Sequence, residues 1–115
     1  MEMTDLRDRK PRLFEHGDVR VTLDADGFLV QPDVWTEDVA RALAAADGLD
    51  PLTEDHWKVM RYVRAYWEER DVAPMIRRLC RETGFTLKQI YLLFPDGPAN
   101  GACRYAGLPK PEGCV

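Results

Sequence analysis

The chain has 115 residues, enough for one domain with a hydrophobic core, and 45% of them are hydrophobic. No apolar run approaches the roughly 18 residues that a membrane-spanning helix needs. The formal net charge of −4 argues against a nucleic-acid-binding domain, because such domains are usually basic. Met1 is followed by charged residues without an apolar stretch, so we expect no signal peptide and a cytoplasmic protein.

The N-terminal third has the pattern of a short β-structure behind a polar leader. Residues 1–17 are polar and charged, and we expect them to be loosely ordered. Apolar and polar residues alternate over 19–23, which predicts a half-buried strand. Residues 24–27 have turn chemistry and 28–30 are apolar, so the pattern predicts a β-hairpin. A lone hairpin is marginal in water, so its apolar face must lie on helices.

Helix signals fill most of the remaining chain. Three threonines stand where N-caps are expected, and the last forms a capping box with Gln89: Thr36, Thr53 and Thr86. Pro74 suits an early position of a helix that Gly84 ends. The pattern predicts helical stretches over residues 37–46, 54–70, about 74–83, 87–94 and 98–105.

These elements predict a mostly α (α+β) domain over residues 18–106. We expect an N-terminal β-hairpin packed on an orthogonal bundle of four to five short helices. Two glycines and two prolines interrupt residues 107–115 and cannot continue a helix or a central strand, so we expect a mobile C-terminal arm there.

Two cysteines near the C-terminus are the first candidates for chemistry. Cys103 and Cys114 stand eleven positions apart, and Cys114 is the penultimate residue. Because chain ends fray unless they are tied down, the simplest interpretation of Cys114 is a thiol on a mobile arm that can enter another protein. The carboxylate of Val115 disfavours its thiolate, and Lys110 or Arg104 could offset that effect.

The same two cysteines could also react with each other. Reducing conditions in the cytoplasm make a permanent disulfide an unsuitable explanation for the pair. Closing a loop of about a dozen residues stabilises a chain by just under ~3 kcal/mol, so such a bond would switch rather than lock. From base rates alone, Cys103 could equally be a small buried apolar residue.

The C-terminal stretch also resembles a known family. Residues 93–98, 103–111 and 113–115 look like the signature of the family of the dissimilatory sulfite reductase gamma subunit, the DsrC/TusE family of small sulfur-relay proteins. A weaker resemblance runs through residues 26–29, 52–57 and 73–77. The resemblance implies the architecture predicted above.

The resemblance further implies that Cys114 accepts or donates sulfur as a persulfide and that Cys103 attacks or shares it. The protein would be a carrier rather than a stand-alone enzyme, without a cofactor. The rest of the signature would form the supporting arm: Arg104, Gly107, Leu108, Pro109, Lys110, Pro111 and Gly113.

The resemblance implies two alternative sets of partners. Members with both cysteines resemble partners of the sirohaem sulfite reductase α/β enzyme, and a membrane thiol/disulfide redox complex is a further partner of this kind. Members that keep only the penultimate cysteine resemble relays for tRNA thiolation in a sulfurtransferase complex. This chain has both cysteines, but the segment 85–91 looks shorter than in reductase partners.

The remaining cysteine and the two histidines have simpler interpretations. We expect Cys80 to be an inert core residue on the apolar face of its helix, because Ile76 and Leu79 share that face. His16 is expected to be solvated and His56 to be a polar surface residue. The cysteine spacings do not match a zinc site, so no metal is predicted.

A basic cluster marks one end of the predicted bundle: Arg77, Arg78, Arg81 and Lys88. One interpretation is a solvated face that complements a helix dipole. The other is a docking surface that steers an acidic partner. A DNA-binding helix pair is the alternative from a different class, although the acidic net charge disfavours it.

Overall fold

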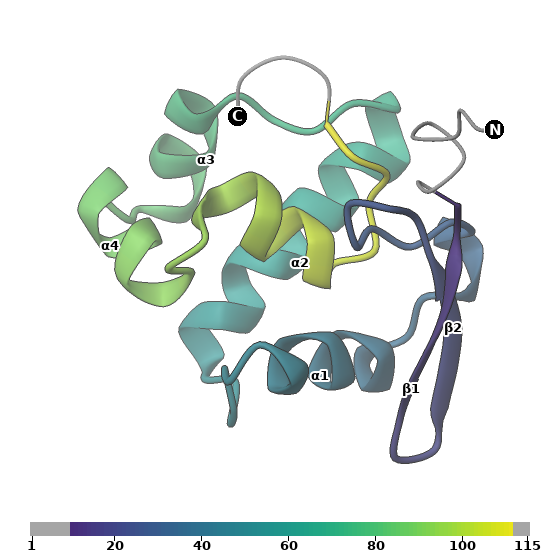
Figure 1. Ribbon diagram of the computed structural model, residues 1–115. Coiled ribbons are helices and arrows are strands. Elements are labelled where there is room, and N and C mark those ends of the chain that lie inside the picture. Colours follow the sequence, from purple (N-terminus) through teal and green to yellow (C-terminus); the bar gives the residue numbers. More distant parts are fainter. Residues whose placement is uncertain (1–9, 112–115) are drawn as a thin grey trace, which may run out of the picture.

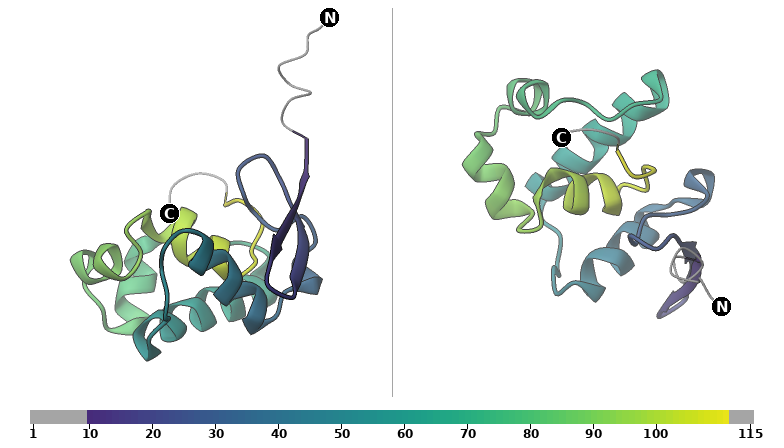
Figure 2. Two further views of the ribbon diagram at one scale, coloured as in Figure 1. Left: turned by 60° about the horizontal axis from the view of Figure 1, so that its bottom comes forward. Right: turned by 45° about the horizontal axis from the view of Figure 1, so that its top comes forward.

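The computed structural model describes residues 10–111. A two-stranded antiparallel sheet comes first, and α-helices follow, with a π-helical segment near the C-terminal end (Figure 1). The elements are β1 (Arg12–His16), β2 (Val19–Leu23), the short 3-10 turn Pro32–Val34, α1 (Glu37–Ala46), α2 (Glu54–Arg70), α3 (Ile76–Thr83), α4 (Leu87–Leu93) and the π-helical segment Pro98–Cys103. Both views in Figure 2 place the hairpin at one side of the helices.

Threonine caps begin three of the helices, as predicted. The hydroxyls of Thr36, Thr53 and Thr86 accept backbone N–H bonds from the residue three positions later. The Thr86–Gln89 capping box is complete, with distances of 2.8 and 3.1 Å. Helix α3 begins at Ile76, so Pro74 lies just before it rather than within it.

The hairpin differs from the predicted one. β2 pairs with β1, with Phe14 opposite Val21, and residues 28–30 contribute only the bridge between Leu29 and Leu23. The strand Arg12–His16 therefore lies within residues 1–17, which were expected to be loosely ordered. This strand is mostly exposed and lacks alternation, so its backbone pairing with β2 rather than a hydrophobic pattern defines it.

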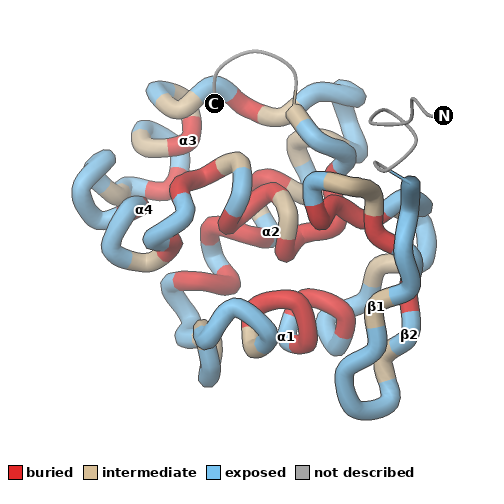
Figure 3. Tube along the Cα trace, viewed as in Figure 1, coloured by how far each residue is buried: buried red, intermediate tan, exposed pale blue. Residues whose placement is uncertain are grey.

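Helix α2 is the centre of the core. It contacts both the π-helical segment and α3, and α1 packs against the hairpin. The buried residues in Figure 3 are concentrated along α1, α2 and the π-helical segment. Fully buried side chains at the centre include Val59, Val63, Phe94 and Leu108.

The folded body extends beyond the predicted boundary at residue 106. Gly107 and Leu108 are buried, and Leu108 belongs to the main hydrophobic core. The part of the arm that the structure describes is therefore attached to the body at its base. Residues 112–115, which include Gly113 and Cys114, lie outside the described residues.

Candidate functional site

The π-helical segment holds Cys103 in the core. It follows Gly97 and Pro98, and Gly101 presses against Phe94 so closely that a Cβ would lie 2.7 Å from the Phe94 Cβ. Cys103 is fully buried, and this burial raises the pKa of its thiol to about 12. Its thiol is therefore protonated at neutral pH and shielded from solvent, so it is a poor nucleophile as it stands.

The helix that contains Cys103 ends in a Schellman motif. The Leu108 N–H donates to the Cys103 carbonyl at 3.1 Å, and the Gly107 N–H donates to the Arg104 carbonyl at 3.2 Å. Gly107 has a φ of +79°, the left-handed conformation that this motif needs. The base of the arm is thus bonded to the backbone of Cys103 itself.

Arg104 is occupied with structural contacts. Its guanidinium pairs with Asp47, its Nε donates to the Asn100 carbonyl at 2.8 Å, and Tyr105 donates its hydroxyl to the same Asp47 at 2.7 Å. Burial lowers the pKa of Arg104 and raises that of Tyr105. Arg104 therefore ties the end of the π-helical segment to Asp47, at the C-terminal end of α1. In this arrangement its guanidinium is not available to activate a thiol.

Arg64 and Trp35 surround the base of the arm, and neither was singled out from the sequence. Trp35 donates its indole N–H to the Tyr105 carbonyl at 2.8 Å, and Arg64 donates to the Ala106 carbonyl at 3.1 Å. The only available signal was an arginine within the apolar stripe of α2, at helical spacing from Met60. We call Trp35 and Arg64 the collar.

The described arm continues along the hairpin side of the molecule. In Figure 1 the yellow segment runs between α2 and the loop that follows β2. Lys110 pairs there with Asp26 at 3.2 Å, and both side chains are partly exposed. Pro109 and Lys110 are exposed, in contrast to the buried Leu108.

The predicted basic cluster lies on α3 and α4, which contact each other. A shallow pocket of 470 Å³ is lined by residues around the first turns of α3: Met75, Ile76, Arg77, Arg78 and Arg81. Met75 is 64% exposed beside these arginines. Lys88 is exposed on α4. The surface combines positive charge with an apolar side chain.

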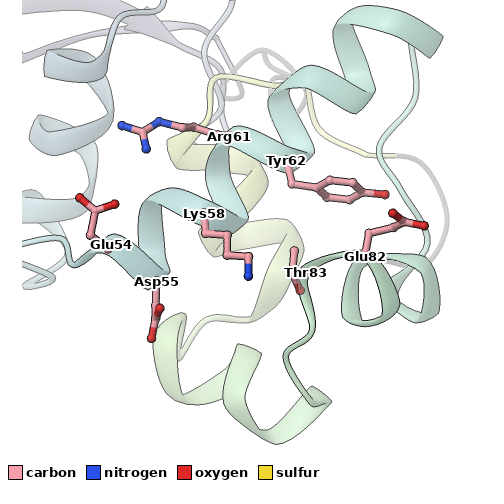
Figure 4. A pocket seen from close by; sticks show the side chains of 7 residues that line it. All are labelled: Glu54, Asp55, Lys58, Arg61, Tyr62, Glu82 and Thr83. Atoms are coloured by element: carbon pink, nitrogen blue, oxygen red, sulfur yellow. The ribbon is translucent and has the colours of Figure 1, made fainter.

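A larger groove between α2 and α3 was not predicted. Its volume is 630 Å³, and Figure 4 shows the seven side chains that line it: Glu54, Asp55, Lys58, Arg61, Tyr62, Glu82 and Thr83. Three carboxylates and two cations alternate there without a dominant charge. Burial, and then Glu82, raise the pKa of Tyr62.

His56 was predicted to be a polar surface residue, and this prediction is wrong. It is 7% exposed; its Nδ1 accepts the Thr53 N–H at 3.0 Å, and its Nε2 donates to the Leu93 carbonyl at 2.9 Å. His56 thus joins the start of α2 to the end of α4. Cys80 is a free thiol, half-buried against the core, and His16 is exposed.

Clusters of metal ligands and membrane-spanning helices are both absent from residues 10–111. No group of three or more His, Cys, Asp or Glu side chains in that range could hold a metal ion. No helix there combines the length and apolar character that crossing a bilayer requires.

The described residues form a small, mostly helical domain in which the buried Cys103 lies four residues before Gly107, the base of the arm. The model of the DsrC family, described as "DsrC like protein", matches residues 15–115. The gamma subunit of the dissimilatory-type sulfite reductase of Nitratidesulfovibrio vulgaris is 43% identical over 93 residues, 81% of this chain and 89% of that protein. The sulfurtransferase TusE of Pectobacterium atrosepticum is 39% identical over 102 residues, 83% of this chain and 93% of that protein.

A solved structure agrees with these matches. The crystal structure of the oxidized DsrC gamma subunit from Archaeoglobus fulgidus superposes with a TM-score of 0.79 and 45% identity, covering 90% of this chain and 100% of that chain. The chain belongs to the DsrC-like family.

Proposed function

We propose that this protein is a sulfur carrier that holds sulfur as a persulfide on Cys114. Its membership of the DsrC-like family and the names of its relatives, a sulfite reductase gamma subunit and a sulfurtransferase, support this role. The observation that carries it is the contrast between two cysteines: Cys114 is penultimate, and Cys103 is buried where the arm begins.

The chemistry needs two balanced steps. In the first, a donor persulfide transfers its outer sulfur to the Cys114 thiol, and the donor leaves as a thiol. In the second, the Cys103 thiol attacks the inner sulfur of the Cys114 persulfide. A Cys103–Cys114 disulfide forms and hydrogen sulfide leaves, so the sulfur is reduced while the two cysteines are oxidised. A dithiol reductant then restores both thiols.

The two cysteines could instead retain the sulfur atom between them. That bridge forms when the Cys114 persulfide and the Cys103 thiol together lose two electrons and two protons. The step requires a two-electron acceptor, the chemistry that a membrane thiol/disulfide redox complex supplies. In either case the high pKa of Cys103 keeps it unreactive until a rearrangement exposes it.

The partner is a protein that takes sulfur from Cys114. The sulfite reductase α/β enzyme is the first candidate, because the gamma subunit of N. vulgaris is among the relatives and this chain has both cysteines. Arg77, Arg78, Arg81 and Lys88 form the docking surface for an acidic face of that partner. The carrier works in the cytoplasm, where reducing conditions keep its thiols free.

A relay of sulfur to tRNA thiolation is the second candidate, and the TusE relatives favour it. That relay would use Cys114 alone. The Cys103→Ala variant separates the two: it should keep full transfer to an acceptor in a relay, but lose sulfide release in a two-cysteine mechanism.

The assignment of Cys114 is tested by mass spectrometry of the intact protein after incubation with a persulfide donor. The wild type should gain the mass of one sulfur atom, and Cys114→Ala should gain almost none while its circular dichroism stays unchanged. Cys80→Ala is the matched control and should load normally. A Cys114→Ala protein that still carries sulfur would refute the assignment.

A further inference from the structure

Arg64 makes an unusual set of contacts for an arginine in the middle of a helix. Its side chain is only 13% exposed, and its guanidinium lies 4.8 Å from the centre of the Trp35 ring and 5.4 Å from that of Trp67. Cation–π contacts of this kind strengthen when they are removed from water. Glu68 accepts its Nε–H at 2.8 Å.

The other guanidinium nitrogens bind two backbone carbonyls from separate parts of the chain. Nη1 donates to Ala106 at 3.1 Å, and Nη2 donates to Pro32 at 3.0 Å. Only the planar fork of arginine can serve both carbonyls and Glu68 at once. Arg64 thus joins the base of the arm to the turn that precedes Trp35.

The backbone at Gly107 fits tightly inside this collar. A Cβ on Gly107 would lie 2.5 Å from Trp35 Cδ1 and 2.9 Å from Arg64 Nη1. Beyond the collar, Leu108 is fully buried, whereas Pro109 and Lys110 are exposed. The change from enclosed to open chain therefore falls between Leu108 and Pro109.

We infer that Arg64 is a positioning residue for the arm: by holding Ala106 it makes the chain pivot at Pro109 instead of at the end of the helix near Tyr105. This inference rests on the proposed function, in which the arm delivers Cys114. With the collar closed, the chain is held up to Leu108, and the stretch from the pivot to Cys114 has six residues in the sequence, 109–114. With it open, the pivot would shift back to Arg104, the stretch to Cys114 would have eleven residues, 104–114, and Leu108 would leave the Cys103 carbonyl.

The Leu108 amide reports on the collar directly, because its N–H is bonded to Cys103. In Arg64→Met, hydrogen exchange at Leu108 should accelerate about ten-fold, the equivalent of one hydrogen bond from a charged donor. The most protected amides of α2 should keep their rates, which separates local release from global loss of stability. Unchanged exchange at Leu108 would overturn the inference.

Arg61→Met is the matched control. Arg61 lies on the same helix, stacks 5.3 Å from the centre of the Trp57 ring and pairs with Glu37 at 3.3 Å, with no backbone carbonyl of the arm among these partners. Its substitution should leave Leu108 exchange unchanged. Trp35→Phe is a second variant that removes the indole donor to Tyr105 and keeps a smaller aromatic ring beside Arg64, and it should accelerate the same amide to a smaller extent.

Sulfide release from the persulfidated protein gives the functional readout, measured in a Cys80→Ala background. Opening the collar lengthens the loop between the pivot and Cys114 from six to eleven residues, so, once a rearrangement has exposed Cys103, release should slow about 2- to 3-fold in Arg64→Met. Cyanide, which removes the outer sulfur of a persulfide without Cys103, should react at the wild-type rate. Faster exchange with unchanged sulfide release would make Arg64 merely structural. A wild type that does not load sulfur would instead contradict the proposed function and leave the exchange result valid.

Discussion

Gly107 occupies a position where the structure accepts no side chain. Its positive φ disfavours any side chain, and Trp35 leaves no room for a Cβ. Gly107→Ala should lower the free energy of unfolding by about 2–5 kcal/mol, the sum of the left-handed strain and the overpacking. Urea denaturation measures this.

Gly84→Ala is the control for the strain alone. Gly84 has a φ of +82°, but nothing lies within 4 Å of its Cβ position. Gly84→Ala should lower the free energy of unfolding by about 1–2 kcal/mol. If both variants lost the same free energy of unfolding, the Trp35 side chain would be able to shift and accommodate a methyl group.

The buried thiol of Cys103 predicts a pH dependence of stability. The folded state holds the pKa near 12, against 9.0 for an ordinary thiol, so above pH 9 the unfolded chain binds fewer protons than the folded one. The stabilisation that the protonated Cys103 thiol contributes to the folded state is therefore fully present below pH 9. It is lost as the pH rises toward 12, at about 1 kcal/mol of unfolding free energy for each pH unit.

The comparison of wild type with Cys103→Ala isolates that contribution. Burial also raises the pKa of Tyr105, so both proteins should lose stability in alkali. Chemical denaturation at several pH values should nevertheless give a steeper loss for the wild type. Parallel curves would mean that the thiol is not desolvated in the folded protein.

In the capping box at the start of α2, the imidazole of His56 takes the place of the glutamate or glutamine side chain that is usual three residues after the N-cap. Because Nδ1 accepts from Thr53, the ring hydrogen lies on Nε2 and is donated to Leu93. His56→Ala should destabilise the protein by about 2–3 kcal/mol, through the lost cap and the unpaired, half-buried Leu93 carbonyl. Thermal unfolding tests this, and nitrogen chemical shifts test the tautomer.

His56→Gln refines the same test. Glutamine can keep the bond to Thr53, as Gln89 does for Thr86, so it should recover part of the loss. Thr86→Ala, at an exposed cap, should cost only about 1 kcal/mol. Full stability of His56→Ala would contradict the joining role of this side chain.

The helices could be predicted from the sequence because their signals are local. The threonine caps and the glycine at position 84 act within one turn, and the helices begin and end close to the predicted residues. The first strand could not be predicted, because its exposed side chains carry no pattern and its partner lies across a turn. The burial of His56 and Arg64 depends on carbonyls 37 and 42 positions away, which no local pattern contains.

The whole molecule carries a net charge of −4 but concentrates arginines on α3. Arg77→Glu combined with Arg81→Glu should slow association with the proposed partner, the sulfite reductase α/β enzyme, about ten-fold at low salt, with a smaller effect at high salt. Arg12→Glu with Arg20→Glu makes the same charge change on the hairpin and is the control. Stopped-flow binding measures both, and equal slowing would assign the effect to net charge rather than to this surface.

The Schellman motif and the collar bear on how relatives can be recognised in genomes. Within residues 104–111, Arg104 holds a loop, Gly107 fits beneath an indole and Leu108 fills the core. These roles depend on packing, not on sulfur. A homologous chain could therefore lose both cysteines of the proposed mechanism, keep this stretch and still fold in the same way. The stretch therefore identifies the fold. Whether a given gene encodes a sulfur carrier must be decided from the presence of the two cysteines.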